Sequence, residues 1–317
     1  MASNVKKDRK VTLFSRIAIA FCLIAALLAI TICTSNPSYN AEHSTTVKIK
    51  SGDDIAKRGV SLYNDNIVLE NDITISSDDA LIGSSEFPFE GVFDGNGHTV
   101  RLSYGNASDI ASLFGYIAQG AEIKNVTFVF DNITINSSYF GGIARVNDGT
   151  IKNCKIEYEN LKITGAGIFS PLVTINNGVI SDAFISGSVS GNMASSDEER
   201  VLFGGACVYN NGTITRIISD TTFSGFLSTD ANNIRIGNAK NFGICAIRYM
   251  DTDDGKLVKA AAVTKDNQVY YEQSPGKNDV SVEFIAAQDL YKYEKIFTVI
   301  GFDDEVWELT DSTLEIK

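Results

Sequence analysis

An imperfect repeat between residues 110 and 260 constrains the fold of this chain more than any other feature. Each unit opens with a phenylalanine, which glycine follows in four of the five units, and a second apolar position comes later. In the three middle units eleven residues separate the two positions. The phenylalanines are Phe114, Phe140, Phe169, Phe203 and Phe242, and the second positions are Ile123, Ile151, Ile180, Ile214 and Leu257. Such self-similarity predicts stacked supersecondary units that bury one continuous core.

A glycine lies two residues before four of the second positions, and a pair of Asn or Asp residues precedes each glycine. These glycines are Gly149, Gly178, Gly212 and Gly255. Because glycine has no Cβ, and Asn or Asp tolerates the left-handed region, we expect positive φ and a tight corner here. Short β-favouring runs, such as residues 126–130 and 214–218, flank the corners.

Strands joined by corners at a constant offset predict an all-β fold, a parallel β-helix whose coils pair at about 4.8 Å. The rings of Phe140, Phe203 and Phe242 are then expected to form one interior column. Cys207 lies four residues after its phenylalanine and Cys245 three after its own. We therefore expect these two side chains on opposite faces of their strands, without a disulfide between them.

The N-terminus has the features of an export segment. Basic residues precede an uncharged apolar run over residues 17–33, which has the length of about 17 residues that a short membrane span needs. A cleavable apolar region is usually nearer 7–15 residues. We expect an uncleaved signal anchor at 17–33 in the cell membrane, with the C-terminal body outside. A secreted protein after signal cleavage is the alternative.

Four parts are expected along the chain. Residues 1–35 form a basic cytoplasmic stub and the anchor, residues 36–51 a polar tether, and residues 52–264 the β-helix with an N-terminal cap. A short helix from Asp53 to about Tyr63 is predicted to make that cap. Residues 265–317 form a C-terminal capping segment, in which residues 286–297 have helical apolar spacing. With Trp307, the only tryptophan, this segment is expected to plug the C-terminal end of the stack.

Little in the sequence points to chemistry. The net charge of −12 argues against nucleic-acid binding. With two histidines in the chain and no C-x-x-C pair, neither a metal nor a cofactor is expected. Asp94 and His98 are the only catalytic candidates, and the glycine-rich stretch around them favours a tight turn instead. Tyrosines in successive units suggest a sugar-stacking row, but unequal offsets favour scattered positions: Tyr104, Tyr116, Tyr139, Tyr158, Tyr209 and Tyr249.

Several stretches resemble GLUG-repeat proteins, which are surface proteins related to the filamentous-haemagglutinin type of right-handed β-helix. The stretches are residues 70–73, 82–83, 89–100 and 112–115 at the entry, 140–144 and 211–214 in the body, and 300–309 at the end. The resemblance covers roughly residues 65–260 and 297–311. It implies a right-handed coil and a cell-surface location, and it does not imply one activity.

These features predict a non-enzymatic, adhesin-like protein of the cell surface that binds glycan, matrix or another cell. One alternative is a β-helical polysaccharide lyase or glycoside hydrolase, which for hydrolysis needs two carboxyl groups about 5–10 Å apart. Another is an envelope scaffold or assembly protein whose ligands are other surface proteins.

Overall fold

The structure is a computed structural model, and the residues that it describes belong to the unit His43–Lys317. They are 45–76, 82–103, 105–107, 112–164, 167–191, 201–224, 227–230, 233–236, 239–248, 256–264, 282–286, 292–310 and 313–317, with the backbone alone at 201–202, 223, 227–264 and 282–286. The predicted anchor at 17–33 lies outside these residues. No helix in the described part of the chain is long and apolar enough to cross a membrane.

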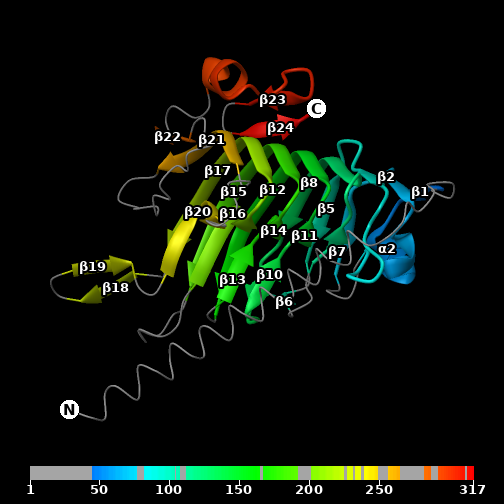
Figure 1. The fold of residues 1–317 in the computed structure, drawn as a ribbon, viewed down its shortest axis with the longest axis horizontal. Coiled ribbons are helices and arrows are strands. Elements are labelled where there is room, and N and C mark those ends of the chain that lie inside the picture. Colours follow the sequence, from blue (N-terminus) through cyan, green and yellow to red (C-terminus); the bar gives the residue numbers. More distant parts are fainter. Residues whose placement is uncertain are drawn as a thin grey trace, which may run out of the picture. The chain divides into compact units, whose positions relative to one another are not determined.

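The fold is a parallel β-solenoid of about four turns (Figure 1), as the repeat predicts. The larger sheet has the order β1-β2-β4-β8-β12-β15-β17-β21-β22, with every neighbouring pair parallel. Its strands are β1 (Thr46–Ile49), β2 (Asn66–Leu69), β4 (Val92–Asp94), β8 (Glu122–Phe130), β12 (Thr150–Ile163), β15 (Val179–Gly191), β17 (Thr213–Ser224), β21 (Lys256–Thr264) and β22 (Val282–Ala286). Four short strands extend it: β3 (Ile73–Ile75), β5 (Thr99–Leu102), β6 (Asn106–Ala107) and β9 (Thr134–Ile135).

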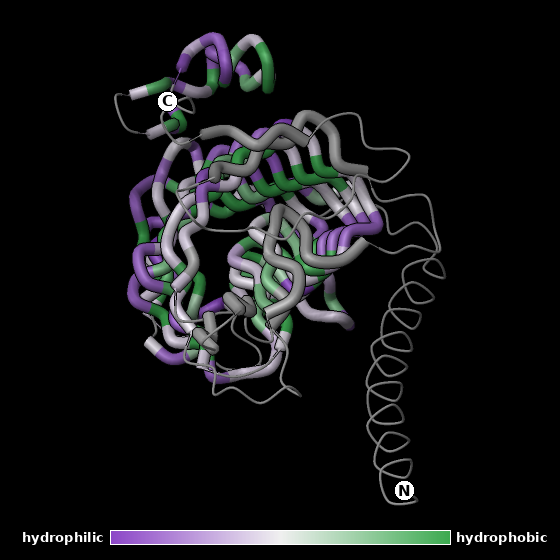
Figure 2. The backbone as a smooth tube through the Cα atoms, turned by 90° about the vertical axis from the view of Figure 1, so that its left-hand side faces the viewer, coloured by the Kyte–Doolittle hydropathy of each residue, from purple (hydrophilic) through white to green (hydrophobic). Residues whose placement is uncertain are grey.

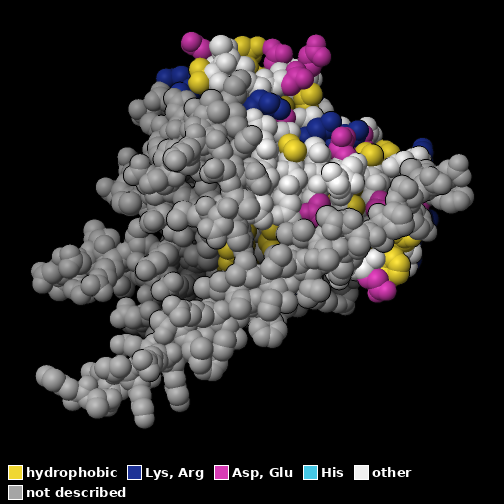
Figure 3. All heavy atoms as spheres, viewed as in Figure 1, with side chains coloured by type: hydrophobic (Ala, Val, Ile, Leu, Met, Phe, Trp, Pro, Cys, Tyr) yellow, Lys and Arg dark blue, Asp and Glu magenta, His cyan; other side chains and the backbone are white. Residues whose placement is uncertain are grey.

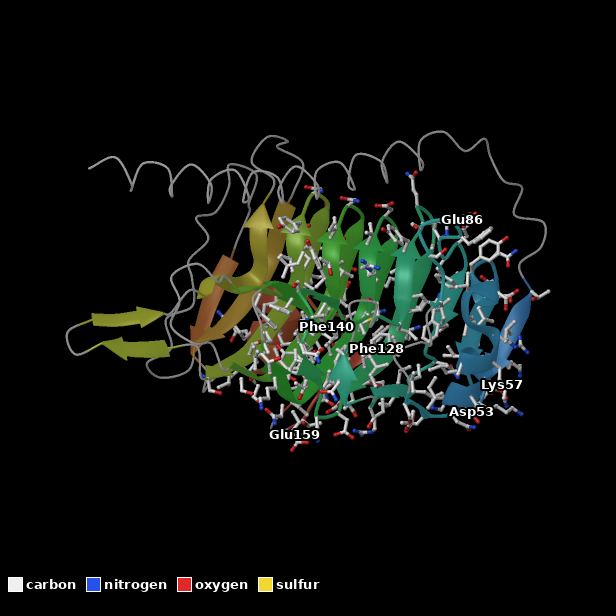
Figure 4. All side chains as sticks on the ribbon, turned by 90° about the horizontal axis from the view of Figure 1, so that it is seen from below. Asp53, Lys57, Glu86, Phe128, Phe140 and Glu159 are labelled. Carbon is white, nitrogen blue, oxygen red and sulfur yellow. The ribbon has the colours of Figure 1, made fainter. Side chains whose placement is uncertain are left out.

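A second parallel sheet forms another wall of each coil. It contains β7 (Phe114–Ile117), β10 (Tyr139–Gly141), β11 (Ala144–Asn147), β13 (Gly167–Ser170), β14 (Val173–Asn176), β16 (Val201–Asn210) and β20 (Ala239–Arg248). Figure 2 looks along the stacking direction, so that successive coils overlie one another. Phe128 and Phe140 lie between the walls, whereas Asp53 and Glu159 lie at the periphery (Figure 4).

The solenoid extends beyond residues 52–264 at both ends. β1 lies within the stretch expected to be a tether, and it pairs with β2. β22 lies within the stretch expected to form the C-terminal segment, and it pairs with β21. Two antiparallel hairpins complete the described strands, β18 (Leu227–Asp230) with β19 (Asn233–Ile236) and β23 (Trp307–Leu309) with β24 (Leu314–Ile316).

The register of the paired strands confirms both predicted columns of apolar residues, with the exception of Phe114. Ile123, Ile151, Ile180, Ile214 and Leu257 are successive register partners. Phe140, Phe169, Phe203 and Phe242 likewise form one column, and the first three side chains are buried. Phe114 does not belong to that column, because its partner is Ala144. The prediction for Phe114 was wrong in register but right in burial, since its side chain has 0% exposure.

The two repeat cysteines also differ from expectation. Cys207 and Cys245 are register partners, because the pairing of β16 with β20 shifts between Gly204 and Cys207. From Gly204 to Cys207 the chain advances three residues, whereas the matching segment from Gly243 to Cys245 advances two. The extra residue in β16 brings the two cysteines to one position of the stack, so their predicted placement on opposite faces was wrong.

The structure places a helical cover at the N-terminal end of the solenoid and the C-terminal segment on the side of the larger sheet. Helix α2 (Gly52–Arg58) and the 3₁₀ turn η1 (Gly59–Leu62) confirm the predicted N-terminal helix, and Ile55 and Leu62 on them are fully buried. A capping box at Ser51 and Asp54 begins α2. At the C-terminus, the π-helical segment η2 (Glu294–Ile300) and the β23–β24 hairpin do not plug the end. They pack on the outer face of the larger sheet, against Phe184 and Ile218.

Candidate functional site

The corners that precede β12, β15 and β17 are built on a buried ladder of asparagines. Asn147, Asn176 and Asn210 are register partners with 0% exposure. The Nδ2 of Asn147 donates to the Oδ1 of Asn176 at 2.8 Å, and the Nδ2 of Asn176 donates to the Oδ1 of Asn210 at 2.8 Å. Each buried amide therefore satisfies its neighbour, which holds consecutive corners in register.

The glycines in these corners have a different role from the predicted one. Gly149, Gly178 and Gly212 are not among the residues with positive φ. A Cβ on Gly178 would lie 2.1 Å from the carbonyl oxygen of Gly149, and one on Gly212 would lie 2.0 Å from that of Gly178. Glycine is needed because consecutive coils approach too closely for any side chain. Gly255 lies outside the described residues.

A second polar ladder lies beside the buried one, and its residues are half-buried in the same corners. The Nδ2 of Asn177 donates to the Oδ1 of Asp148 at 2.7 Å, and the Nδ2 of Asn211 donates to the Oδ1 of Asn177 at 2.8 Å. These residues line an open groove of about 440 Å³. The described residues that line it are Gln119, Gly120, Asp148, Gly149, Thr150, Asn177, Gly178, Val179, Asn211, Gly212 and Thr213.

The groove runs from coil to coil, because its lining repeats at equivalent positions. Thr150, Val179 and Thr213 are register partners along one wall, and the outer ladder forms the other. Two carbonyls of the glycine floor are already hydrogen-bonded within the stack. The N–H of Val179 donates to the carbonyl of Gly149 at 2.9 Å, and the N–H of Thr213 donates to the carbonyl of Gly178 at 2.9 Å. Among the lining residues within the described part of the chain, only Asp148 is ionisable.

An ion-pair network lies next to this groove. Glu122 is the register partner of Thr150, and its carboxylate lies 2.9 Å from the Nζ of Lys124 and 3.2 Å from that of Lys152. Partial burial opposes ionisation of Glu122, but the hydrogen bonds to the two lysines outweigh burial and hold the pKa of its carboxyl below the ordinary value. The two ammonium groups are therefore engaged with Glu122.

The two catalytic candidates have separate partners. The Oδ1 of Asp94 accepts from the N–H of Asn96 at 2.9 Å and from the Nδ2 of Asn125 at 3.2 Å. The Nδ1 of His98 lies 3.2 Å from the Oδ1 of Asp72. Asp94 thus fixes its own turn, in which Asn96 and Gly97 have positive φ, as the turn interpretation predicts. No acid–base pair of Asp94 with His98 is formed.

The tyrosines take several different places. Tyr116 and Tyr209 share one register column with Val146 and Ile175 between them. Tyr158 is buried and its ring lies 6.5 Å from that of Phe203, so it belongs to the core. Tyr104 and Tyr249 lie outside the described residues. A continuous row of tyrosines is therefore not formed by the described members.

A corner with left-handed backbone does exist, but it lies at a position where the repeat does not predict one. Asn125, Asn153, Asp182 and Arg216 interrupt β8, β12, β15 and β17 with φ of 51° to 53°. Asn153 donates to Asn125 at 3.3 Å, and the guanidinium of Arg216 donates to both carboxylate oxygens of Asp182, at 2.5 and 2.6 Å. The Asn and Asp members were the available signal, because these residues tolerate the left-handed region best.

The outer face of the larger sheet carries the C-terminal segment. Lys155, Phe184 and Ile218 are register partners that point away from the solenoid core. The Nζ of Lys155, whose side chain is 2% exposed, lies 2.6 Å from a carboxylate oxygen of Glu315 and 2.8 Å from one of Glu157. Acidic and basic side chains alternate around this segment (Figure 3).

The described part of the chain offers no metal site, and its Cys154 thiol is not activated. No group of three or more His, Cys, Asp or Glu residues there is arranged to hold a metal ion. Cys154 is fully buried, and this burial raises the pKa of its thiol far above the ordinary value. Comparisons of the chain with protein-family models, with curated proteins and with solved structures give no match.

Proposed function

We propose that this protein is an exported, non-enzymatic surface protein that binds glycan, matrix or another cell through the side of its solenoid. In this proposal residues 17–33 anchor it in the cell membrane, and the solenoid stands outside as a right-handed coil of the GLUG-repeat kind. A right-handed sense is also the physical expectation, since nearly all crossovers between parallel strands have it.

The polar groove at the asparagine corners is the observation that carries the proposal. It places a carboxylate or amide side chain at equivalent positions of three consecutive coils, which suits recognition of an extended ligand. Asp94 and His98 are each bonded to another residue and form no acid–base pair with one another, which favours binding over catalysis. The absence of a lysine, arginine or histidine among the described residues of the groove lining argues against a nucleic-acid ligand.

Attachment of the producing cells tests this function. Cells with and without the gene are compared on immobilised glycans, matrix proteins and other cells, and the full-length gene is restored as the control. The expected result is attachment that disappears with the gene and returns with it. Protease added to intact cells should also remove the solenoid. Equal attachment by both strains across the panel would contradict the proposal.

A further inference from the structure

The repeat of the groove identifies the kind of ligand that it fits. The outer ladder residues Asp148, Asn177 and Asn211 come from consecutive coils, which stack at about 4.8 Å. A ligand lying along the groove therefore meets a polar side chain at each step, the carboxylate of Asp148 first and then the amides of Asn177 and Asn211. We propose that this groove binds a linear, uncharged polysaccharide whose chain runs parallel to the stacking direction. This inference rests on the proposed surface-binding function and names its ligand class and its site.

The ladder leaves hydrogen-bonding capacity for sugar hydroxyls. An Asn side chain has two donors and an acceptor oxygen with two lone pairs. Asn177 uses one N–H toward Asp148 and accepts one N–H from Asn211. The ladder bonds also fix the orientation of the amide, so little conformational entropy is lost when a hydroxyl binds. A hydroxyl group both donates and accepts, which matches an amide better than a charged group does.

The floor of the groove allows close approach of a sugar ring. Gly149, Gly178 and Gly212 contribute no side chain, and the carbonyls of the first two are already paired within the stack. Val179, which is 37% exposed, adds an apolar surface on the opposite wall. Such a floor suits the C–H face of a pyranose ring, while the ring hydroxyls reach the ladder.

Charge excludes the other common extended ligands. A uronic-acid polymer would meet Asp148, find no cation among the lining residues that the structure describes, and approach a chain of net charge −12. A nucleic acid is disfavoured for the same reason. A peptide that adds a strand needs an exposed sheet edge with free N–H and C=O groups. The groove floor lies inside the stack, where the carbonyls of Gly149 and Gly178 are already paired with the next coil, so it offers no such edge.

Titration of the purified full-length chain with oligosaccharides tests the site. Neutral cello-, manno- and chito-oligosaccharides of two, four and six units are compared with oligogalacturonate by isothermal calorimetry. Affinity for at least one neutral series should rise up to about four units, one for each coil that lines the groove, and oligogalacturonate should not bind. Binding of oligogalacturonate alone, or of no neutral series, would overturn the inference.

Three variants test whether the oligosaccharide binds in the groove. Asn177→Ala should weaken the neutral ligand about tenfold, the equivalent of one or two lost hydrogen bonds. Val179→Lys, at a half-exposed position, should weaken it at least as much and serves if Asn177→Ala folds poorly. Ser190→Ala, at the far end of the same strand β15, is the matched control and should bind normally. Unchanged binding in both groove variants would refute the site. If cells that carry those variants still attach, the surface function stands, but the groove is not the site through which the cells attach.

Discussion

The buried asparagine ladder gives the most direct test of how the coils hold together. Asn176 is its middle member, with 0% exposure, and it bonds to Asn147 and to Asn210 at 2.8 Å each. Asn176→Ala removes both ladder bonds, so the buried Oδ1 of Asn210 loses this donor and the buried Nδ2 of Asn147 keeps only a contact of 3.4 Å with the carbonyl of Val179. An orphaned buried polar group costs about 1–3 kcal/mol, so the free energy of unfolding should fall by about 2–6 kcal/mol.

Urea unfolding of the full-length chain, followed by circular dichroism, measures this loss. Asn177→Ala is the matched control, because Asn177 is the next residue in the chain and bonds in the same way but is only half-buried. That variant should lose only about 1 kcal/mol, since water replaces the missing amide. A loss below about 1 kcal/mol for Asn176→Ala, with an unchanged m value, would refute the assigned role of the buried ladder.

Asn176→Asp adds a dependence on pH with a defined sign. A carboxylate there still accepts from Asn147, but it faces the acceptor oxygen of Asn210. Burial and this contact both disfavour the charged form, so the folded-state pKa of the new carboxyl should be raised above its unfolded value. The stability deficit of this variant should therefore shrink as the pH falls through the folded-state pKa. A deficit that does not change with pH would contradict the geometry.

Three further variants or measurements address other parts of the solenoid. Gly178→Ala should destabilise the chain by at least about 1–3 kcal/mol in urea unfolding, because its Cβ would lie 2.1 Å from the carbonyl oxygen of Gly149. Phe184→Ala should lose about 3–5 kcal/mol despite its place on the outer face, because the C-terminal segment covers it fully. The Cys154 thiol should react with Ellman's reagent at pH 8 only after unfolding, since burial raises its pKa.

The first two of these predictions have a control variant, and each of the last two has an outcome that would contradict it. Asn177→Ala, in the same corner as Gly178, separates the clash from a general sensitivity of the corner. Phe87→Ala removes a ring that is 45% exposed and should lose far less stability than Phe184→Ala. A near-neutral Phe184→Ala variant would show that the C-terminal segment does not pack there. Fast labelling of Cys154 in the folded chain, read by mass spectrometry, would show that its coil opens readily.

The sequence predicts register well where corners have constant length. Eleven residues link each phenylalanine to its isoleucine in the middle units, and those columns are observed. The first unit has another length. Nine residues separate Phe114 from Ile123, whereas seven separate its register partner Ala144 from Ile151. Two additional residues at one corner shift the preceding strand, and residue types alone do not show which strand moves.

The C-terminal segment could not be placed from its pattern for a related reason. The spacing of apolar residues predicts that one side of the segment is buried, and Ile296, Ile300 and Trp307 are indeed buried. Spacing does not identify the surface that buries them. That surface is marked by Phe184 and Ile218, which look like ordinary strand residues in the sequence and whose outward orientation depends on register.

The candidate groove shows how a correct residue pattern can be given the wrong physical cause. The Asn-Gly corners were found because their residue types favour positive φ, yet positive φ occurs at Asn125, Asn153, Asp182 and Arg216 instead. Within one coil both corners satisfy the rules for a turn. What distinguishes them is contact between coils, where one corner has room for side chains and the other only for glycine. The same close approach leaves a glycine floor between two polar walls. The groove is therefore a consequence of how tightly the coils stack, and any variant that loosens this corner should reduce stability and ligand affinity together.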